Sequence, residues 1–246
     1  MNTSFAKYAK YYDRIYADKA YAVESQYIRK ILKKKKLKIL EVGCGSGGHA
    51  LQLHKMGHKI TAIDSSKQMI SAAKKKSKKI AFLVKDGLYY RSKTKFDAII
   101  LLFHVINFFK NLKELESFFI NCSYNLKLGG ILICDFININ ALKKHPPIKK
   151  IKTVVIKNKI SLVRKTFPSF NKTTNIFTIR FRILIYKLKL LIDNFSEIHR
   201  LRIHSIDELK KSYGNYFKKP KIYKWLTLEK LKKNIDWNAT LVIKKK

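Results

Sequence analysis

Apolar residues recur along the chain with two periods, and the order of these periods predicts the fold class. Short apolar runs bounded by glycine or polar residues predict buried strands, at Lys38–Val42, Lys59–Ile63, Ile80–Val84, Ala98–Phe103 and Ile131–Phe136. Apolar residues at helical spacing predict intervening helices, at Tyr21–Leu32, His49–Met56, Lys67–Lys76 and Leu112–Leu126, the last ended by Gly129-Gly130. Strands alternating with helices are typical of a doubly wound, Rossmann-like α/β sheet.

The pattern changes after Pro146-Pro147, where β-rich runs follow one another without helices. The expected strands are Thr153–Ile156, Ile160–Phe167, Ile176–Ile185 and Lys189–Ile192, with turns at Asn158-Lys159 and Asn171-Lys172. Ser205 and Glu208 form a capping box that starts a helix over Ser205–Tyr213. Two later runs, Lys218–Trp225 and Thr240–Ile243, would complete a seven-stranded sheet. We therefore expect a core of residues 1–145 and 204–246, interrupted by an antiparallel β insertion of residues 146–203.

The first strand ends in a glycine-rich turn, and an acidic residue closes the second strand. Gly43, Gly45 and Gly47 carry no Cβ, so the chain turns sharply there and a ligand reaches the backbone. Asp64 provides a carboxylate that accepts hydrogen bonds from both hydroxyls of a ribose. Gly43, Gly45 and Gly48 also satisfy the spacing of dinucleotide-binding folds, so the spacing alone leaves the cofactor open.

Glu41 extends the turn to E-x-G-x-G-x-G, which resembles the first motif of class I S-adenosylmethionine (AdoMet)-dependent methyltransferases. The tyrosine-rich segment Tyr8–Tyr21 is similar to the start of a subgroup containing aminosugar N-methyltransferases and relatives from surface-polysaccharide gene clusters. The resemblance implies that residues of the loop hold the methionine end of AdoMet, namely Glu41, Gly43, Cys44, Gly45 and Gly47. It also implies a helical N-terminal lid in which Tyr12 and Tyr21 cover the cofactor. Packing of these rings on the sheet is the alternative.

Further cofactor contacts follow from the same resemblance. Asp86 and Gly87 come after the third predicted strand and match the position where the family meets the adenine, with an acceptor and an amide donor side by side. An Asp-Gly turn without a ligand is the alternative. Ser65 and Met69 lie where the family lines the adenosine pocket, and Asp64 would bind the ribose.

Two histidines are candidates for catalysis. His104 follows the fourth strand, at the edge where an α/β sheet presents ligands, and would act as a general base when the acceptor carries a proton. His199 shares one strand face with Glu197, which would orient the imidazole. Packing against the cofactor is the alternative for His104, and a structural polar pair is the alternative for His199.

The formal net charge of +38 raises the question of a nucleic-acid substrate. The charge is spread over both halves of the chain, only eight of its 54 basic residues are arginine, and the composition fits a genome rich in A and T. The stretch around His104 also lacks the prolines of methyltransferases that modify base amines. We therefore expect a small polar acceptor, by resemblance a nucleotide-linked or lipid-linked sugar. RNA or tRNA methylation is the first alternative, and a non-catalytic nucleotide-binding Rossmann module is the second.

Other features of the sequence concern the location of the protein in the cell and the state of its cysteines. No apolar run approaches the ~18 residues of a membrane span, and Met1–Lys10 has no apolar region of a signal peptide. We expect a cytoplasmic protein, a monomer or a homodimer. Cys44, Cys122 and Cys134 lack metal-ligand spacing, so we expect reduced thiols and no metal site.

Overall fold

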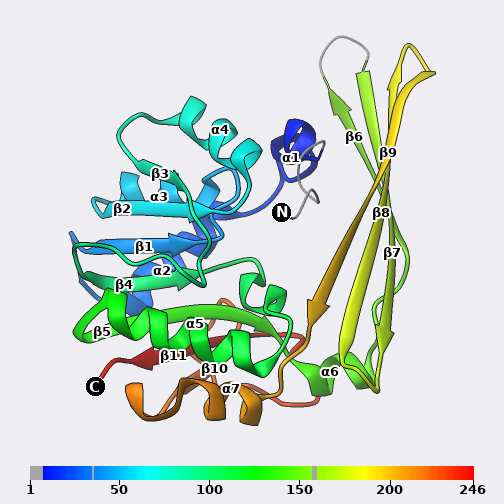
Figure 1. The fold of residues 1–246 in the computed structure, drawn as a ribbon. Helices are drawn as coiled ribbons and strands as arrows, with labels where there is room; N and C mark the ends of the chain where they lie inside the picture. Colours follow the sequence, from blue (N-terminus) through cyan, green and yellow to red (C-terminus); the bar gives the residue numbers. More distant parts are fainter. Residues whose placement is uncertain (1–7, 35, 157–159) are drawn as a thin grey trace.

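A computed structural model describes residues 8–34, 36–156 and 160–246, which form two β-sheets (Figure 1). The larger sheet has seven strands in the order β10-β11-β5-β4-β1-β2-β3. Its strands are β1 (Lys38–Val42), β2 (Lys59–Asp64), β3 (Ala81–Val84), β4 (Phe96–Leu101), β5 (Leu126–Ile137), β10 (Lys221–Lys224) and β11 (Asn238–Lys244). Strands β1 to β5 pair in parallel, and β11 runs antiparallel to both β5 and β10. The predicted seven-stranded, mostly parallel sheet is confirmed.

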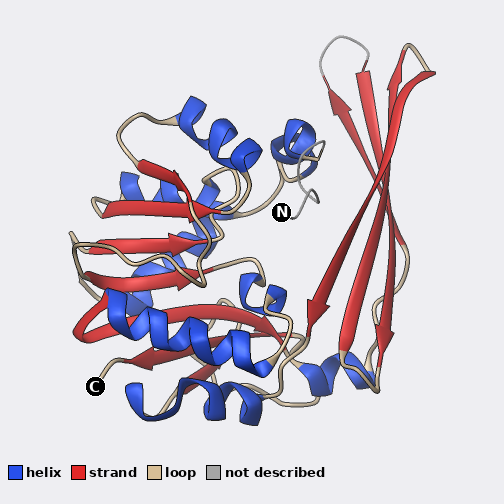
Figure 2. Cartoon of the chain, in the orientation of Figure 1, coloured by secondary structure: helices blue, strands red, loops and turns tan. Residues whose placement is uncertain are grey.

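Helices cover both faces of this sheet (Figure 2). Successive residues of a strand point to opposite faces, and because apolar residues point to both, each face needs a covering layer. The helices are α2 (Tyr21–Leu32), α3 (Gly48–Lys55), α4 (Lys67–Lys76), α5 (Leu112–Asn125), α6 (Ile139–Lys144), α7 (Ile206–Tyr213) and the short 3-10 turns η2 (Val105–Phe108) and η3 (Gly214–Tyr216). Leu40 and Val42 of β1 pack in the core beneath α5 and α7, whereas Ile39 packs in the core beneath α2 and α3. Among the described residues, no helix is both long and apolar enough to cross a membrane.

The smaller sheet stands beside the core, with the N-terminal helix α1 (Ala9–Ile15) between them (Figure 1). It consists of β6 (Lys150–Ile156), β7 (Ile160–Asn171), β8 (Ile176–Lys187) and β9 (Leu190–Arg202), all antiparallel. On β8, Phe181 and Ile183 are buried in a cluster that includes Tyr8 and Tyr12, whereas Arg180 and Arg182 are exposed. We call the face with Phe181 the inner face and the face with Arg180 the outer face.

Some predicted boundaries were wrong. Helix α5 ends at Asn125 rather than at the glycines, because β5 begins directly at Leu126 and contains both Gly129 and Gly130. A Cβ on Gly130 would lie 2.9 Å from the Lys127 carbonyl oxygen, so glycine fits a tight stretch within a strand there. The last strand of the insertion extends to Arg202, and α6 was not predicted. The predicted turn at Asn158-Lys159 lies outside the described residues.

Asn107 joins the smaller sheet to the larger one at the point where β9 ends. Its Nδ2 donates to the Arg202 carbonyl oxygen at 3.1 Å, and its Oδ1 accepts from the Ile137 amide at 3.3 Å. The side chain is fully buried. Its amide group thus satisfies backbone groups of β9 and β5 that water does not reach.

We predict that Asn107→Ala lowers the free energy of unfolding by about 2 kcal/mol, because it leaves buried backbone groups without partners. Urea denaturation measures the change. Asn194→Ala, which removes an exposed amide from the outer face, is the matched control and should change stability by less than about 0.5 kcal/mol. Equal effects of the two substitutions would contradict the assigned role of Asn107.

Candidate active site

The glycine loop between β1 and α3 is tied to the end of β2 by hydrogen bonds. The Gly43 amide donates to the Ile63 carbonyl oxygen at 2.8 Å. The two oxygens of Asp64 accept from the Gly45 and Ser66 amides, each at 2.8 Å. Burial raises the pKa of Asp64, and these two amides oppose the rise. The carboxylate is therefore held in one orientation at the carboxyl edge of the sheet.

The loop can be approached closely because its glycines lack side chains. Gly43 has φ +71°, and a Cβ there would lie 2.6 Å from the Val105 side chain. A Cβ on Gly48 would overlap the Tyr21 ring, and the Tyr12 hydroxyl would lie 3.8 Å from a Cβ on Gly45. The structure thus brings the two predicted lid tyrosines and the turn after β4 onto the same loop.

Hydrogen bonds hold helix α1 against this loop. Ser46 Oγ donates to Asp13 Oδ1 at 2.5 Å, and Lys76 Nζ donates to the same oxygen at 2.6 Å. Tyr12 and Tyr21 form a hydrogen bond between their side chains, and burial raises the pKa of both phenols. Asp13 was not among the predicted residues, although it lies within the tyrosine-rich segment.

Glu41 lies beneath the loop and is 1% exposed. Burial, together with the nearby Asp64 charge, raises the pKa of its carboxyl to about 8. His49 Nδ1 lies 3.7 Å from Oε1, whereas the buried Oε2 has no hydrogen-bond partner among the described residues. A buried acceptor without a donor, beside a glycine turn, fits a ligand that carries an ammonium group.

His49 connects Glu41 to two charged residues of the N-terminal segment. His49 Nε2 lies 2.5 Å from Glu24 Oε2, and Lys19 Nζ donates to Glu24 Oε1 at 2.6 Å. Lys19 Nζ also lies 4.2 Å from the centroid of the Phe103 ring. Burial lowers the pKa of His49, and the Glu24 carboxylate opposes this shift. The network thus links α2 and α3 to the turn after β4.

The remaining predicted cofactor residues differ in their exposure. Asp86 is exposed, its Oδ1 accepts from the Leu88 amide at 2.8 Å, and the Gly87 carbonyl oxygen accepts from Asn121 Nδ2 at 3.1 Å. Ser65 is exposed, and Met69 is buried in the cluster that contains Tyr12. Cys44 is buried and donates weakly to the Gly45 carbonyl oxygen at 3.6 Å, and burial raises its thiol pKa.

His104 is held by a carboxylate that the sequence did not reveal. Phe103 and His104 both have positive φ, of 71° and 63°, which is strained for residues with side chains. The buried Asp135 of β5 stabilises this turn by accepting from the His104 amide at 3.0 Å, and its Oδ2 lies 2.9 Å from His104 Nδ1. The Asp135 carboxylate thus lies beside Nδ1, although the ring N–H is not aligned for a hydrogen bond with it.

His199 lies on the inner face of the insertion within an aromatic layer. Its ring packs edge-on against Phe181, Phe108 and Tyr8, with centroid distances of 5.1, 5.9 and 6.0 Å. Burial lowers the pKa of His199 to about 4 and raises the pKa of Glu197 to about 7. Their closest atoms are 4.0 Å apart, and the predicted shared face is confirmed. The imidazole is therefore neutral at pH 7.

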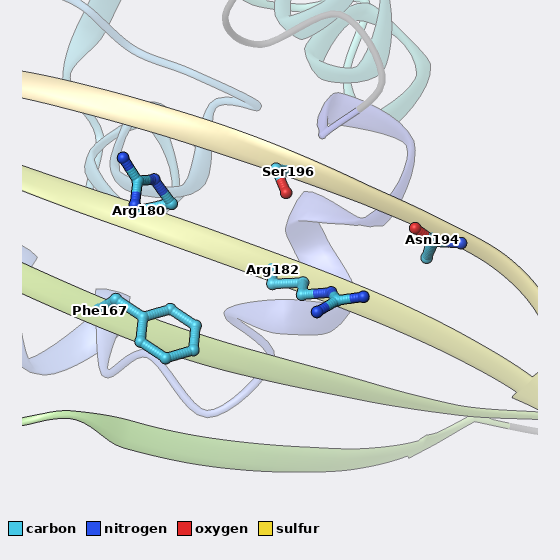
Figure 3. Close-up of a pocket in the computed structure, with 5 residues that line it drawn as sticks. All are labelled: Phe167, Arg180, Arg182, Asn194 and Ser196. Carbon is cyan, nitrogen blue, oxygen red and sulfur yellow. The ribbon is translucent and has the colours of Figure 1, made fainter.

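The carboxyl edge of the sheet thus gathers the glycine loop, Asp64 and His104, and η2 carries Phe108 from this edge to His199. Asp135 was missed by the sequence analysis, although a single acid within the apolar run Ile131–Phe136 is a signal that could have identified it. A separate hollow of about 450 Å³ lies on the outer face of the insertion (Figure 3). Its lining residues are Phe167, Arg180, Arg182, Asn194 and Ser196.

Comparisons with known proteins agree with this geometry. Residues 39–130, from β1 to β5, match the family described as "Methyltransferase domain". YqeM of Bacillus subtilis (strain 168), named as a methyltransferase, is 26% identical over 216 residues, which cover 85% of this chain and 83% of YqeM. GWCH70_2453 of Geobacillus sp. (strain WCH70), also named as a methyltransferase, is 26% identical over 140 residues, which cover 54% of this chain and 57% of that protein.

Solved structures share the architecture of nearly the whole chain. An S-adenosylmethionine-dependent methyltransferase from Clostridium acetobutylicum ATCC 824 is 20% identical, covers 98% of each chain and has a TM-score of 0.79. The sugar N-methyltransferase KedS8 from Streptoalloteichus sp ATCC 53650 is 17% identical, covers 96% of this chain and 92% of its own, and has a TM-score of 0.81. The matched domain and the relatives named as methyltransferases support a methyltransferase, and the strand order is that of the Rossmann-like fold of class I S-adenosylmethionine-dependent methyltransferases.

Proposed function

We propose that this methyltransferase acts on a small polar acceptor, an amino or hydroxyl group of a sugar linked to a nucleotide or a lipid. The observation that carries the proposal is the inner face of the insertion, where Glu197 and His199 lie in an aromatic layer that meets η2. Aromatic walls with a few polar groups suit a small molecule that is partly apolar and is oriented by hydrogen bonds. The similar fold of KedS8, a sugar N-methyltransferase, supports the same class of acceptor.

Each of the proposed cofactor residues would contact a different part of AdoMet. Glu41 Oε2 would accept from the ammonium group, Asp64 from the ribose hydroxyls, and Asp86 with the Gly87 amide would bind the adenine. Tyr12 and Tyr21 would cover the ligand, since both already pack on the glycine loop. Cys44, Ser65 and Met69 would line the site. When bound, AdoMet supplies an electrophilic methyl group on a sulfonium.

The acceptor site lies between two parts of the chain that we propose close over it. Residues 146–203 would act as the substrate lid, and α1 joins this lid to the core through Tyr11, which stacks on Phe195 with a centroid distance of 5.9 Å. Lys152 Nζ of β6 also donates to the Ile15 carbonyl oxygen at 3.0 Å. A closed aromatic layer excludes water and strengthens the electrostatic contacts inside it.

We assign the general base to His104. Its Nδ1 lies 2.9 Å from Asp135 Oδ2, so the carboxylate is placed to stabilise the imidazolium that would form when Nε2 takes a proton from the acceptor. His199, with a pKa of about 4, is a weak base and is better suited to positioning the acceptor. Alignment of the acceptor with the methyl group supplies most of the rate enhancement, up to about 7 to 11 kcal/mol.

We predict that Asp64→Asn weakens AdoMet binding by about 10- to 100-fold, because the ribose hydroxyls lose a charged acceptor. Isothermal titration calorimetry measures the dissociation constant, and circular dichroism checks that the fold is kept. Asp97→Asn is the matched control. Asp97 lies near the start of β4, away from the carboxyl edge of the sheet, and accepts hydrogen bonds from Lys127 Nζ and the Lys38 amide. Undiminished affinity in Asp64→Asn would refute the ribose contact.

The class of acceptor is tested by incubating the protein and methyl-labelled AdoMet with either total RNA or small-metabolite extract from the source organism. At about 150 mM salt, where weak contacts to polyanions are screened, we expect label in small molecules only. Label that appears only in RNA, at selected sequences, would contradict the proposed function. The Asp64→Asn protein serves as the blank in both reactions.

We predict that His104→Gln lowers the rate of methyl transfer by about 10²- to 10⁴-fold while AdoMet affinity stays within about two-fold. Single-turnover transfer to the labelled acceptor, measured from pH 5 to pH 9, gives the rate. His145→Gln is the control, because His145 is exposed after α6. Should His104→Gln retain the wild-type rate and pH profile, the acceptor must lose its proton before it binds.

A further inference from the structure

Arg164 lies on β7 with its guanidinium among aromatic rings of the inner face. The guanidinium carbon is 5.2 Å from the centroid of the Tyr16 ring and 5.3 Å from the centroid of the Phe181 ring. The guanidinium also donates to the Tyr8 hydroxyl. These contacts fix the plane of the guanidinium and favour its positive charge, but none of them brings a negative charge.

Two nitrogens of this guanidinium, Nε and Nη1, are buried and have no hydrogen-bond partner among the described residues. The nearby carboxylate Asp18 is already paired with Lys152. The pKa of Glu197 is raised by burial alone, so Arg164 does not serve as its counter-ion. Arg164 as a whole is half-buried, but two of its donors are shut off from water without an acceptor, which is costly, so this arrangement points to a negatively charged acceptor supplied by a ligand.

The position of Arg164 relates it to the reaction centre. The Tyr16 ring on which it lies packs edge-on against Phe103, with a centroid distance of 5.2 Å, and Phe103 directly precedes His104. Tyr16 also packs against Tyr12, the residue whose hydroxyl lies near Gly45, and the centroids of the two rings are 4.7 Å apart. Tyr16 and Tyr12 thus lie between Arg164, which belongs to the insertion, and the glycine loop of the core.

We propose that Arg164 binds an anionic group of the acceptor, so that the substrate is an anionic small molecule carrying a phosphoryl group or a carboxylate. The inference rests on the proposed function and narrows its acceptor. Nε–H, on the edge that also carries Nη2, and Nη1–H, on the edge beside Cδ, are two separate donors, and either can donate to an oxygen of a phosphoryl or carboxylate group. The aromatic walls exclude water and strengthen the contact.

The distribution of arginine along the chain agrees with a specific role. Only eight of the 54 basic residues are arginine, and five of the eight lie within β7, β8 and β9. Arg180 and Arg182 of the outer face (Figure 3) are exposed. The unpartnered nitrogens of Arg164 are buried instead. Arg180 therefore offers a matched control, since it carries the same charge on the same sheet but lies exposed on the outer face, beside Phe167.

The test is a calorimetric titration of the wild type and of Arg164→Gln, Arg164→Lys and Arg180→Gln with pyrophosphate or malonate. It is carried out in the presence of AdoMet, at about 150 mM salt to suppress binding to surface lysines. We expect one saturable site in the wild type, weakened at least about 30-fold in Arg164→Gln, partly restored in Arg164→Lys, and unchanged within two-fold in Arg180→Gln. Preference for pyrophosphate would assign a phosphoryl acceptor, and preference for malonate a carboxylate acceptor.

Three results would overturn the inference. These are no saturable binding of either anion, equal weakening in Arg164→Gln and Arg180→Gln, or an AdoMet affinity that falls in Arg164→Gln as much as the anion affinity does. The last result would mean that Arg164 binds the cofactor carboxylate. Thermal unfolding of each variant confirms the fold. Arg164-dependent anion binding in a protein that methylates only RNA would refute the small-molecule acceptor and leave the anion site supported.

Discussion

The absence of side chains on the glycine loop is the constraint on which the rest of the site depends. Side chains from α1, α2, β3 and η2 occupy positions that a Cβ on the loop would approach, namely Tyr12 at Gly45, Tyr21 at Gly48, Phe82 at Gly47 and Val105 at Gly43. Each contact orients a different part of the chain. A side chain on Gly43 would displace η2, and the turn with His104 would move with it.

The buried ionisable groups around this loop differ in whether a neighbouring group compensates their charge. The Lys19–Glu24 pair and His49 compensate one another, whereas Glu41 lies in a site so dry that its pKa reaches about 8. A neutral carboxyl at pH 7 avoids the desolvation cost of a buried anion. The charge becomes favourable when a cation arrives. Glu41 therefore has the properties of a receptor for an ammonium group more than of a structural acid.

The insertion and the core form one functional unit through aromatic contacts. Tyr8, Tyr11, Tyr12 and Tyr16 line the side of α1 that meets the inner face, where they pack against Phe181 and Phe195. Polar groups are sparse in this layer, so each one weighs heavily in recognition. Glu197, His199 and Arg164 are such groups, and they are spread across β7 and β9 of the smaller sheet.

The amino-acid sequence by itself determined the α/β class, the glycine loop and the residues of most strands, because these depend on local periodicity and on backbone positions that only glycine fits. It could not place Gly129 and Gly130, because a glycine that ends a helix and one inside a crowded strand look alike until neighbouring strands are present. It also missed Asp135 as the partner of His104 and the buried donors of Arg164. Asp135 lies 31 positions from His104, and Tyr16 is still farther from Arg164; these pairs meet only when β4 pairs with β5 and when α1 packs on the insertion. Only the tertiary structure decided which charged groups lose their water, and that loss of solvent gives the site its chemistry.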